Sequence, residues 1–120
     1  MPRILYIEDD ANNRMLVRRI LMAYGFDVDE ADNAARGIEM AQSDPPDLIL
    51  MDLSMPGMDG LAATRHIRTL PSISTIPIVA LTANVMEGDK ERSLNAGCNG
   101  YISKPIDVDT FADQINQYLR

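Results

Sequence analysis

Four apolar residues in succession, Leu48-Ile49-Leu50-Met51, lead directly into an acid, Asp52. A strand with one solvated face alternates apolar and polar residues, so an unbroken apolar run predicts a strand that is buried on both faces. Pro45-Pro46 precedes this run, and residues 54–60 follow it with turn-forming Pro and Gly. Strands of this kind are typical of parallel sheets covered by helices on both sides, which favours an α/β fold.

Strand patterns alternate with helix patterns along the rest of the chain. The predicted strands are residues 4–7, 26–31, 48–51, 76–81 and 100–103. The predicted helices are a segment that ends at Gly25 and residues 34–42, 61–70, 85–96 and 108–119. The side chains expected to face the core are Leu16, Ile20 and Ala23 in the first helix, Ala35, Ile38 and Ala41 in the second, and Phe111, Ile115 and Leu119 in the last. Five strand–helix repeats predict one doubly wound parallel sheet in a single domain, residues 1–120.

Polar side chains stand at the points where the predicted strands end. Glu8 and Asp9 follow the first strand, Asp52 follows the third, and Thr82 and Lys104 follow the fourth and fifth. Ligands of open parallel sheets bind beyond the carboxyl ends of the strands. We therefore expect these five side chains to converge on one site.

The three carboxylates of this group repel one another, so the cluster needs a cation or raised pKa values. Two like charges about 4 Å apart repel by roughly 4 kcal/mol at an effective dielectric constant near 20. Hard oxygen ligands without nearby His or Cys favour Mg²⁺ over zinc. A carboxylate beside Mg²⁺ can act as a nucleophile toward phosphorus, and Lys104 and Thr82 would supply a counter-charge and a hydroxyl donor. The residues thus indicate phosphoryl chemistry at Asp52.

The composition indicates which kinds of partner and which cellular compartment to expect. The net charge of −7 and the sequence pI of about 4.5 disfavour direct contact with nucleic acid. The basic pairs Arg18–Arg19 and Arg65/Arg68 fit solvated helix faces. A single cysteine, Cys98, excludes an internal disulfide, and no segment reaches the roughly 20 apolar residues of a membrane span. We expect a cytoplasmic protein without membrane or nucleic-acid contacts.

Four segments, in this order, are similar to the receiver domains of bacterial two-component response regulators. They are Ile4-Leu5-Tyr6-Ile7-Glu8-Asp9-Asp10, residues 48–60, Leu81-Thr82-Ala83 and Gly100-Tyr101-Ile102-Ser103-Lys104-Pro105. The resemblance covers essentially the whole chain. It implies a flavodoxin-like fold with five helices and strand order 2-1-3-4-5, the order of the chemotaxis member of the family.

The resemblance also implies a role for individual residues. Asp52 would be the phospho-acceptor. Asp9 and Asp52 would bind Mg²⁺ or Mn²⁺ directly, Ser54 through its backbone carbonyl, and Glu8 through water. Lys104 would contact the phosphoryl group, and its bond to Pro105 would be cis.

Further expectations concern switching and tuning. Thr82 and Tyr101 would be the switch pair, although Tyr101 could also be plain packing. Ser54 and Asn84 stand at positions that tune the lifetime of the phosphoryl group. Asp10 is either a loop residue without a role, which we favour, or an outer group of the metal site.

The resemblance implies signalling through other proteins. A sensor histidine kinase or a histidine phosphotransfer protein would donate the phosphoryl group. Because the sequence stops one helix after Lys104, we expect output through a downstream effector. It would bind the helix at 85–96, the strand at 100–103 and the last helix, or the face of the first helix. The chain would be a monomer or a weak, phosphorylation-dependent dimer, and a switch rather than a turnover enzyme.

Three alternatives share parts of this pattern. A flavin-binding domain of the same architecture would need a Ser/Thr/Gly-rich loop after the first strand, where this chain has acids. An aspartyl phosphatase usually has its general acid two residues after the nucleophile, where this chain has Ser54. A degenerate receiver that only binds partners would not need Asp52, Asp9 and Lys104 together.

Overall fold

Five strands form one parallel sheet in the order β2-β1-β3-β4-β5. The computed structural model describes residues 2–53, 59–82 and 89–119. The strands are β1 (Arg3–Ile7), β2 (Asp27–Ala31), β3 (Leu48–Asp52), β4 (Ile78–Thr82) and β5 (Gly100–Ser103). The helices are α1 (Ala11–Ala23), α2 (Ala34–Ser43), α3 (Gly60–Ile67), α4 (Asp89–Ala96) and α5 (Phe111–Tyr118). The predicted fold class and strand order are confirmed.

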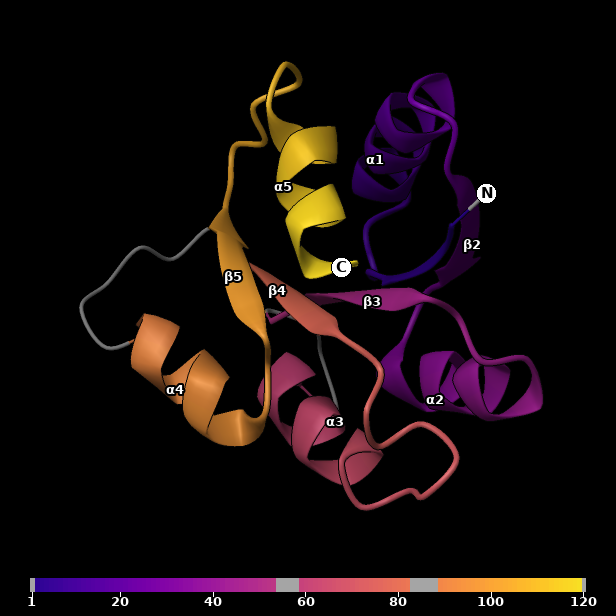
Figure 1. The fold of residues 1–120 in the computed structure, drawn as a ribbon, viewed down its shortest axis with the longest axis vertical. Helices are drawn as coiled ribbons and strands as arrows, with labels where there is room; N and C mark the ends of the chain where they lie inside the picture. Colours follow the sequence, from indigo (N-terminus) through magenta and orange to yellow (C-terminus); the bar gives the residue numbers. More distant parts are fainter. Residues whose placement is uncertain (1, 54–58, 83–88, 120) are drawn as a thin grey trace.

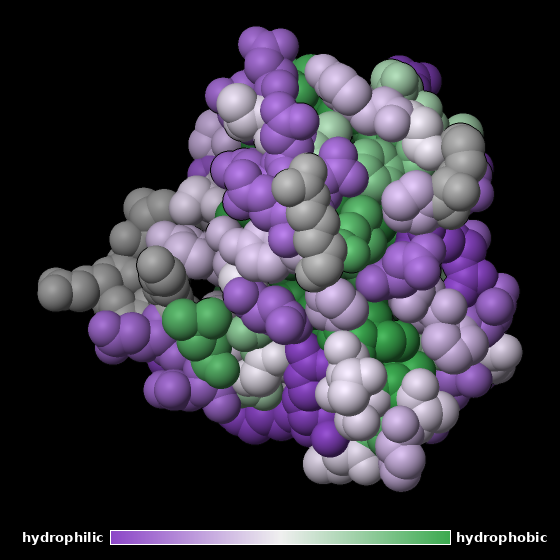
Figure 2. Space-filling model, viewed as in Figure 1, coloured by the Kyte–Doolittle hydropathy of each residue, from purple (hydrophilic) through white to green (hydrophobic). Residues whose placement is uncertain are grey.

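Helices cover both faces of the sheet, so that the molecule has three layers (Figure 1). Side chains of α1 and α5 pack on one face against Ile4 and Tyr6 of β1. Side chains of α2 and α3 pack on the other face against Leu5 and Ile7. In the same view the outer surface is mostly hydrophilic, and hydrophobic side chains show mainly in the depth between the helices (Figure 2). The alternation along β1 therefore supplies both halves of the core.

The central strands are buried along their whole length, as the apolar runs predict. Every residue of β3 and β4 is buried, whereas β2 at the sheet edge alternates between exposed and buried residues. The fourth strand begins at Ile78, two residues later than predicted, because Pro77 has no N–H to donate to a neighbouring strand. Its carbonyl still accepts from the N–H of Ile49.

Two predicted helix faces are wrong in detail. Leu16 is 50% exposed and Ala23 is exposed, whereas Val17, Ile20 and Leu21 face the core. In α2 the buried residues are Ala34, Gly37, Ile38 and Ala41, and Ala35 is exposed. Spacings of three and four fit more than one stripe of an apolar-rich helix, and packing on the sheet selects one of them. The prediction for α5 holds for Phe111 and Ile115, while Leu119 lies just beyond the helix and is partly buried.

Two glycines and an acid stand at helix ends, and the sequence had indicated Gly25 among them. Gly25 follows α1 with a φ of 92°, and Gly97 follows α4 with a φ of 114°, conformations that favour glycine. The carboxylate of Asp59 accepts from the N–H of Ala62 at 2.8 Å and caps α3, which begins at Gly60. The boundaries of these helices thus follow from local chemistry.

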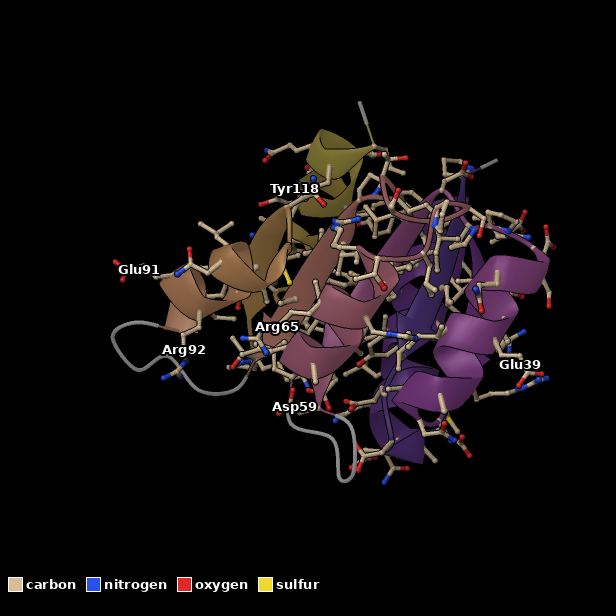
Figure 3. All side chains as sticks on the ribbon, turned by 90° about the horizontal axis from the view of Figure 1, so that it is seen from below. Glu39, Asp59, Arg65, Glu91, Arg92 and Tyr118 are labelled. Carbon is tan, nitrogen blue, oxygen red and sulfur yellow. The ribbon has the colours of Figure 1, made fainter. Side chains whose placement is uncertain are left out.

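Arg68 does not lie on a solvated face, contrary to the prediction for the Arg65/Arg68 pair. Its guanidinium donates to the carbonyls of Gly97 at 2.9 Å, Ser74 at 3.1 Å and Ile76 at 2.7 Å, and to Oδ1 of Asn99 at 2.8 Å. These acceptors come from the segment before β4 and the turn before β5. Arg68 therefore ties the end of α3 to both neighbouring connections. Glu39 of α2 and Glu91 and Arg92 of α4, in contrast, lie at the periphery of the molecule (Figure 3).

Candidate functional site

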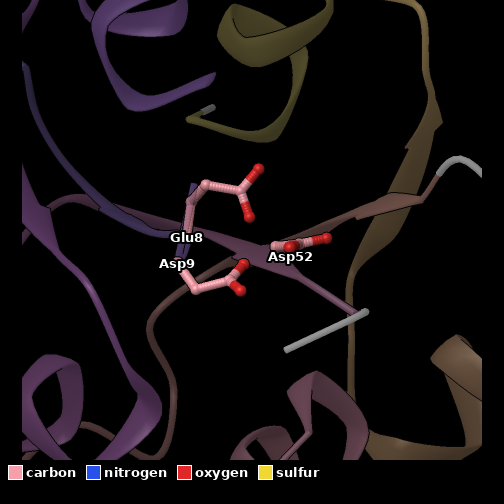
Figure 4. Close-up of side chains that lie close together, drawn as sticks. All are labelled: Glu8, Asp9 and Asp52. Carbon is pink, nitrogen blue, oxygen red and sulfur yellow. The ribbon is translucent and has the colours of Figure 1, made fainter. Parts of the chain in front are cut away.

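Three carboxylates meet at the carboxyl edge of the sheet (Figure 4). Glu8 and Asp9 come directly after β1, and Asp52 is the last residue of β3. Because β1 and β3 are neighbours in parallel register, their ends deliver these side chains to one place. One oxygen from each carboxylate lies within 4.8 Å of the others. Glu8 and Asp52 are buried and Asp9 is exposed, so the cluster is open to solvent on one side.

Lys104 reaches the cluster from the end of β5. Its Nζ lies 3.0 Å from Oε1 of Glu8 and 3.4 Å from Oδ1 of Asp52. Burial lowers the pKa of Lys104, but the hydrogen bond with Glu8 and the charge of Asp52 outweigh it and raise this pKa above its usual value. The ammonium is therefore fully charged at neutral pH. The peptide bond between Lys104 and Pro105 is cis.

Three further side chains hold Glu8, and the sequence reasoning had missed them. The hydroxyl of Tyr6 donates to Oε1 at 3.3 Å, and Nδ2 of Asn13 donates to the same oxygen at 2.9 Å. The guanidinium of Arg14 donates to the backbone carbonyl of Glu8 at 2.7 Å. Tyr6 gave a signal in the sequence, because its hydroxyl needs a partner within a buried apolar strand. Asn13 and Arg14 gave none, since their direction depends on how α1 sits on the sheet.

The second oxygen of Glu8, Oε2, is buried and has no hydrogen-bond partner among the described residues, so no donor compensates its negative charge. Burial, followed by the interaction with Asp52, raises the pKa of Glu8 above its usual range, and Lys104 only partly opposes this. A divalent cation, or a water molecule bound to it, would give this unpaired oxygen a partner beside the two other carboxylates. The residues present fit Mg²⁺, because all of them offer hard oxygen atoms.

Thr82 and Tyr101 lie on neighbouring strands next to the cluster. Thr82 ends β4 and is buried, and the residue before it, Leu81, stands opposite Asp52. Tyr101 of β5 stands opposite Ala80 of β4 and is half-buried on the side of the core that α2 and α3 cover. Side chains two positions apart along a strand share a face, so the hydroxyl and the ring lie on the same side of the sheet.

Comparison with known families covers nearly the whole chain: residues 4–116 match the response regulator receiver domain. The chain belongs to the receiver domain family. It is 38% identical over 120 residues to the polar-differentiation response regulator DivK of Brucella anthropi, with 99% of this chain and 98% of that protein covered. Receiver domains have a phospho-acceptor role in two-component signalling, and this chain shares it. The family assignment agrees with the predicted resemblance and leaves the flavin-binding alternative without support.

Solved structures of receiver domains superpose closely on this one. The receiver domain of a sensor histidine kinase from Pseudomonas aeruginosa PAO1 is 33% identical, has a TM-score of 0.90 and covers 98% of this chain and 97% of its own. That structure has a magnesium ion coordinated in the active site cleft. The chemotaxis protein CheY4 of Vibrio cholerae, 24% identical with a TM-score of 0.93 and 98% of both chains covered, shares the fold.

Asp10 has a structural role in this receiver domain that the sequence reasoning had not assigned. Its carboxylate caps α1 by accepting from the N–H groups of Asn12 at 2.8 Å and Asn13 at 3.2 Å. An acid directly before a helix is the usual signal for such a cap. Asp10 therefore has a structural role as the cap of α1, and it is not one of the three carboxylates whose oxygens lie within 4.8 Å of one another. Two other predicted residues, Ser54 and Asn84, lie outside the described residues.

Proposed function

We propose that Asp52 accepts a phosphoryl group from a phosphohistidine and that residues 1–120 act as one receiver domain. The observation that carries the proposal is the position of Asp52 between two carboxylates, Glu8 and Asp9, and the ammonium of Lys104. A buried carboxylate at a strand end, with an entry from solvent beside it, is placed for attack on an incoming phosphorus atom. The phosphorus–nitrogen bond to imidazole would break as the bond to the Asp52 oxygen forms, giving an acyl phosphate.

Mg²⁺ is the cation that we propose for this site, and Mn²⁺ could replace it. Asp9, Asp52 and the backbone carbonyl of Ser54 would bind it directly, and Glu8 would bind through water. The unpaired Oε2 of Glu8 supports this assignment, as does the magnesium ion of the Pseudomonas relative. When bound, the metal would neutralise charge on the phosphoryl oxygens during transfer.

Lys104 and Thr82 are the proposed partners of the phosphoryl group. Lys104 already contacts Asp52, and Thr82 stands one residue beyond the position opposite it. Their bonds to the phosphoryl oxygens would exist only in the modified state, and inward rotation of Tyr101 would accompany the movement of Thr82. We propose a switch whose own groups promote phosphorylation and dephosphorylation, without steady turnover of a substrate.

Two surfaces are proposed for partners. An effector would bind the face of α4, β5 and α5, where Leu94 is 44% exposed. A histidine kinase or phosphotransfer protein would bind α1, where Met15 and Leu16 are half exposed. Leu16 also lines a cavity of about 190 Å³ together with Lys104 and Ile106. No helix among the described residues is long and apolar enough to cross a membrane. We further propose a cytoplasmic monomer or weak phosphorylation-dependent dimer that does not bind nucleic acid.

Acetyl phosphate with Mg²⁺ tests the acceptor. Intact-mass analysis is expected to show one added phosphoryl group on the wild type and none on Asp52→Asn. Asp59→Asn is the matched control, because Asp59 is an exposed acid beyond the cluster and asparagine also caps helices. Equal labelling of Asp52→Asn and the wild type would remove Asp52 from the role. Lys104→Ala should still bind Mg²⁺ but lose the phosphorylation-dependent gain in partner affinity.

A further inference from the structure

Glu8 uses its two oxygens in different ways, and side chains outside the acidic cluster create the difference. Oε1 accepts from Tyr6 at 3.3 Å, Asn13 at 2.9 Å and Lys104 at 3.0 Å. Oε2 is buried without a partner in the described part of the chain. Three donors on one oxygen fix the rotation of the carboxylate. They leave Oε2 as the atom that can meet a cation or its water.

We infer that Tyr6 and Asn13 are positioning residues, which hold the Glu8 carboxylate so that Oε2 is available to the metal. The inference rests on the proposed function, because it assumes that a cation binds the acidic cluster. It goes beyond that function by assigning part of the metal affinity to two uncharged side chains that do not contact the ion. Groups that orient ligands in this way commonly set metal affinity.

Lys104 shows why two other donors are needed. The same ammonium contacts Glu8 and Asp52, so a phosphoryl group on Asp52 would draw it away from Glu8. Glu8 is 1% exposed, and a buried carboxylate without donors is costly. Tyr6 and Asn13 keep Oε1 satisfied when Lys104 leaves. Neither of them carries a charge at neutral pH that would compete with the metal.

The two residues differ in their surroundings, which makes them complementary tests. Tyr6 and Asn13 both line the cavity of about 190 Å³, but Tyr6 has no exposed surface, whereas Asn13 is half-buried on α1. Water can therefore take the place of the Asn13 amide in a variant more readily than that of the Tyr6 hydroxyl. Tyr6→Phe is therefore expected to have the larger effect and Asn13→Ala the smaller one.

Calorimetric titration with Mg²⁺, without any phosphodonor, measures the effect directly. We expect the dissociation constant for Mg²⁺ to rise about tenfold in Tyr6→Phe, the lower end of what the loss of such a partner costs. The rise in Asn13→Ala should be smaller, about threefold, because water can replace its amide. Matched controls are Tyr24→Phe, which removes a hydroxyl from a tyrosine that is 54% exposed, and Asn12→Ala, which changes an exposed neighbour on α1. Both controls should keep the affinity of the wild type.

A double-mutant cycle separates positioning from a general structural effect. In a Glu8→Gln background, Tyr6→Phe and Asn13→Ala should weaken Mg²⁺ binding no further, because they act through Glu8. The inference is overturned if both single variants keep the affinity of the wild type, or if they weaken binding equally in the wild-type and Glu8→Gln backgrounds. A wild type without any Mg²⁺ affinity would instead refute the metal part of the proposed function. Urea unfolding of each variant in EDTA identifies any loss of folding, and Asn13→Ala remains informative if Tyr6→Phe is unstable.

Discussion

Replacing Glu8 by glutamine is expected to stabilise the metal-free protein by about 2 kcal/mol, because the site keeps a charged carboxylate where the fold disfavours it. The raised pKa of Glu8 gives the sign: the folded protein prefers the uncharged form more than the unfolded chain does. The glutamine side chain can still accept at Oε1 from Tyr6 and Asn13. Its amide can donate to Asp52 from the position of the unpaired Oε2.

The magnitude follows from the distances. The carboxylate oxygens lie within 4.8 Å of one another, so at an effective dielectric constant of 20 the repulsion of Glu8 by Asp52 is at least about 3 kcal/mol, and solvent weakens that by the exposed Asp9. The attraction of Glu8 to Lys104 at 3.0 Å is about 5 kcal/mol on the same scale. The repulsions and the attraction nearly cancel. The remaining term is the cost of burying a carboxylate, which is several kcal/mol, reduced by the stabilisation from its hydrogen bonds. A net gain of about 2 kcal/mol corresponds to a rise of about 6–10 °C in Tm for a chain of this size.

Urea unfolding at pH 7.5 in EDTA and in saturating Mg²⁺ tests this reasoning. In EDTA, Glu8→Gln should be more stable than the wild type. In Mg²⁺ the difference should shrink, because the wild type gains more from the metal. Glu91→Gln, which removes one exposed charge from α4 at the periphery of the molecule, controls for net charge (Figure 3). The reasoning fails if Glu8→Gln is no more stable in EDTA than Glu91→Gln.

Three further predictions concern the pH dependence of stability, the partly buried guanidinium of Arg68 and the tight contact at Gly60. Because the pKa of Glu8 is raised in the folded state, the stability of the protein in EDTA should rise relative to Glu8→Gln as the pH falls from neutral toward the usual pKa of a glutamic acid; parallel curves from urea titrations would contradict this. Arg68→Ala should lower the free energy of unfolding by about 2 kcal/mol, with unchanged Mg²⁺ affinity in calorimetry, because three partly buried carbonyls lose their donor. Gly60→Ala should destabilise the protein and lower the rate of phosphorylation by acetyl phosphate, since its Cβ would lie 2.4 Å from the carbonyl oxygen of Asp52; a rate equal to that of the wild type would show that the backbone shifts without cost.

The sequence predicts the strands and the acidic cluster well because both depend on local pattern. Apolar runs that end in acids mark β1 and β3 and, with parallel pairing, place Glu8, Asp9 and Asp52 at one edge. The similarity to receiver domains then supplied the strand order. The buried face of a helix is harder to predict from sequence. Leu16 fits the spacing rule as well as Val17 does, and only packing on the sheet decides which of them is buried.

The contacts around the cluster could not be predicted, because they join elements whose relative rotation no local pattern encodes. Asn13 reaches Glu8 from the first turn of α1, the turn that Asp10 caps. Arg68 fits a solvated helix face by sequence, yet it finds its acceptors in segments up to 31 residues away. Side chains that bridge distant elements are therefore the part of the site that requires coordinates.

Lys104 connects the chemistry of the cluster to the far edge of the sheet. It lies 52 residues from Asp52 in sequence and directly follows β5, the strand that carries Tyr101. Its charge is divided between Glu8 and Asp52. A change of charge on Asp52 would change that division at the end of β5. Because Glu8 keeps the donors Tyr6 and Asn13, releasing Lys104 costs less than breaking an isolated buried ion pair, and a movement of Lys104 toward Asp52 needs only a modest gain in attraction there.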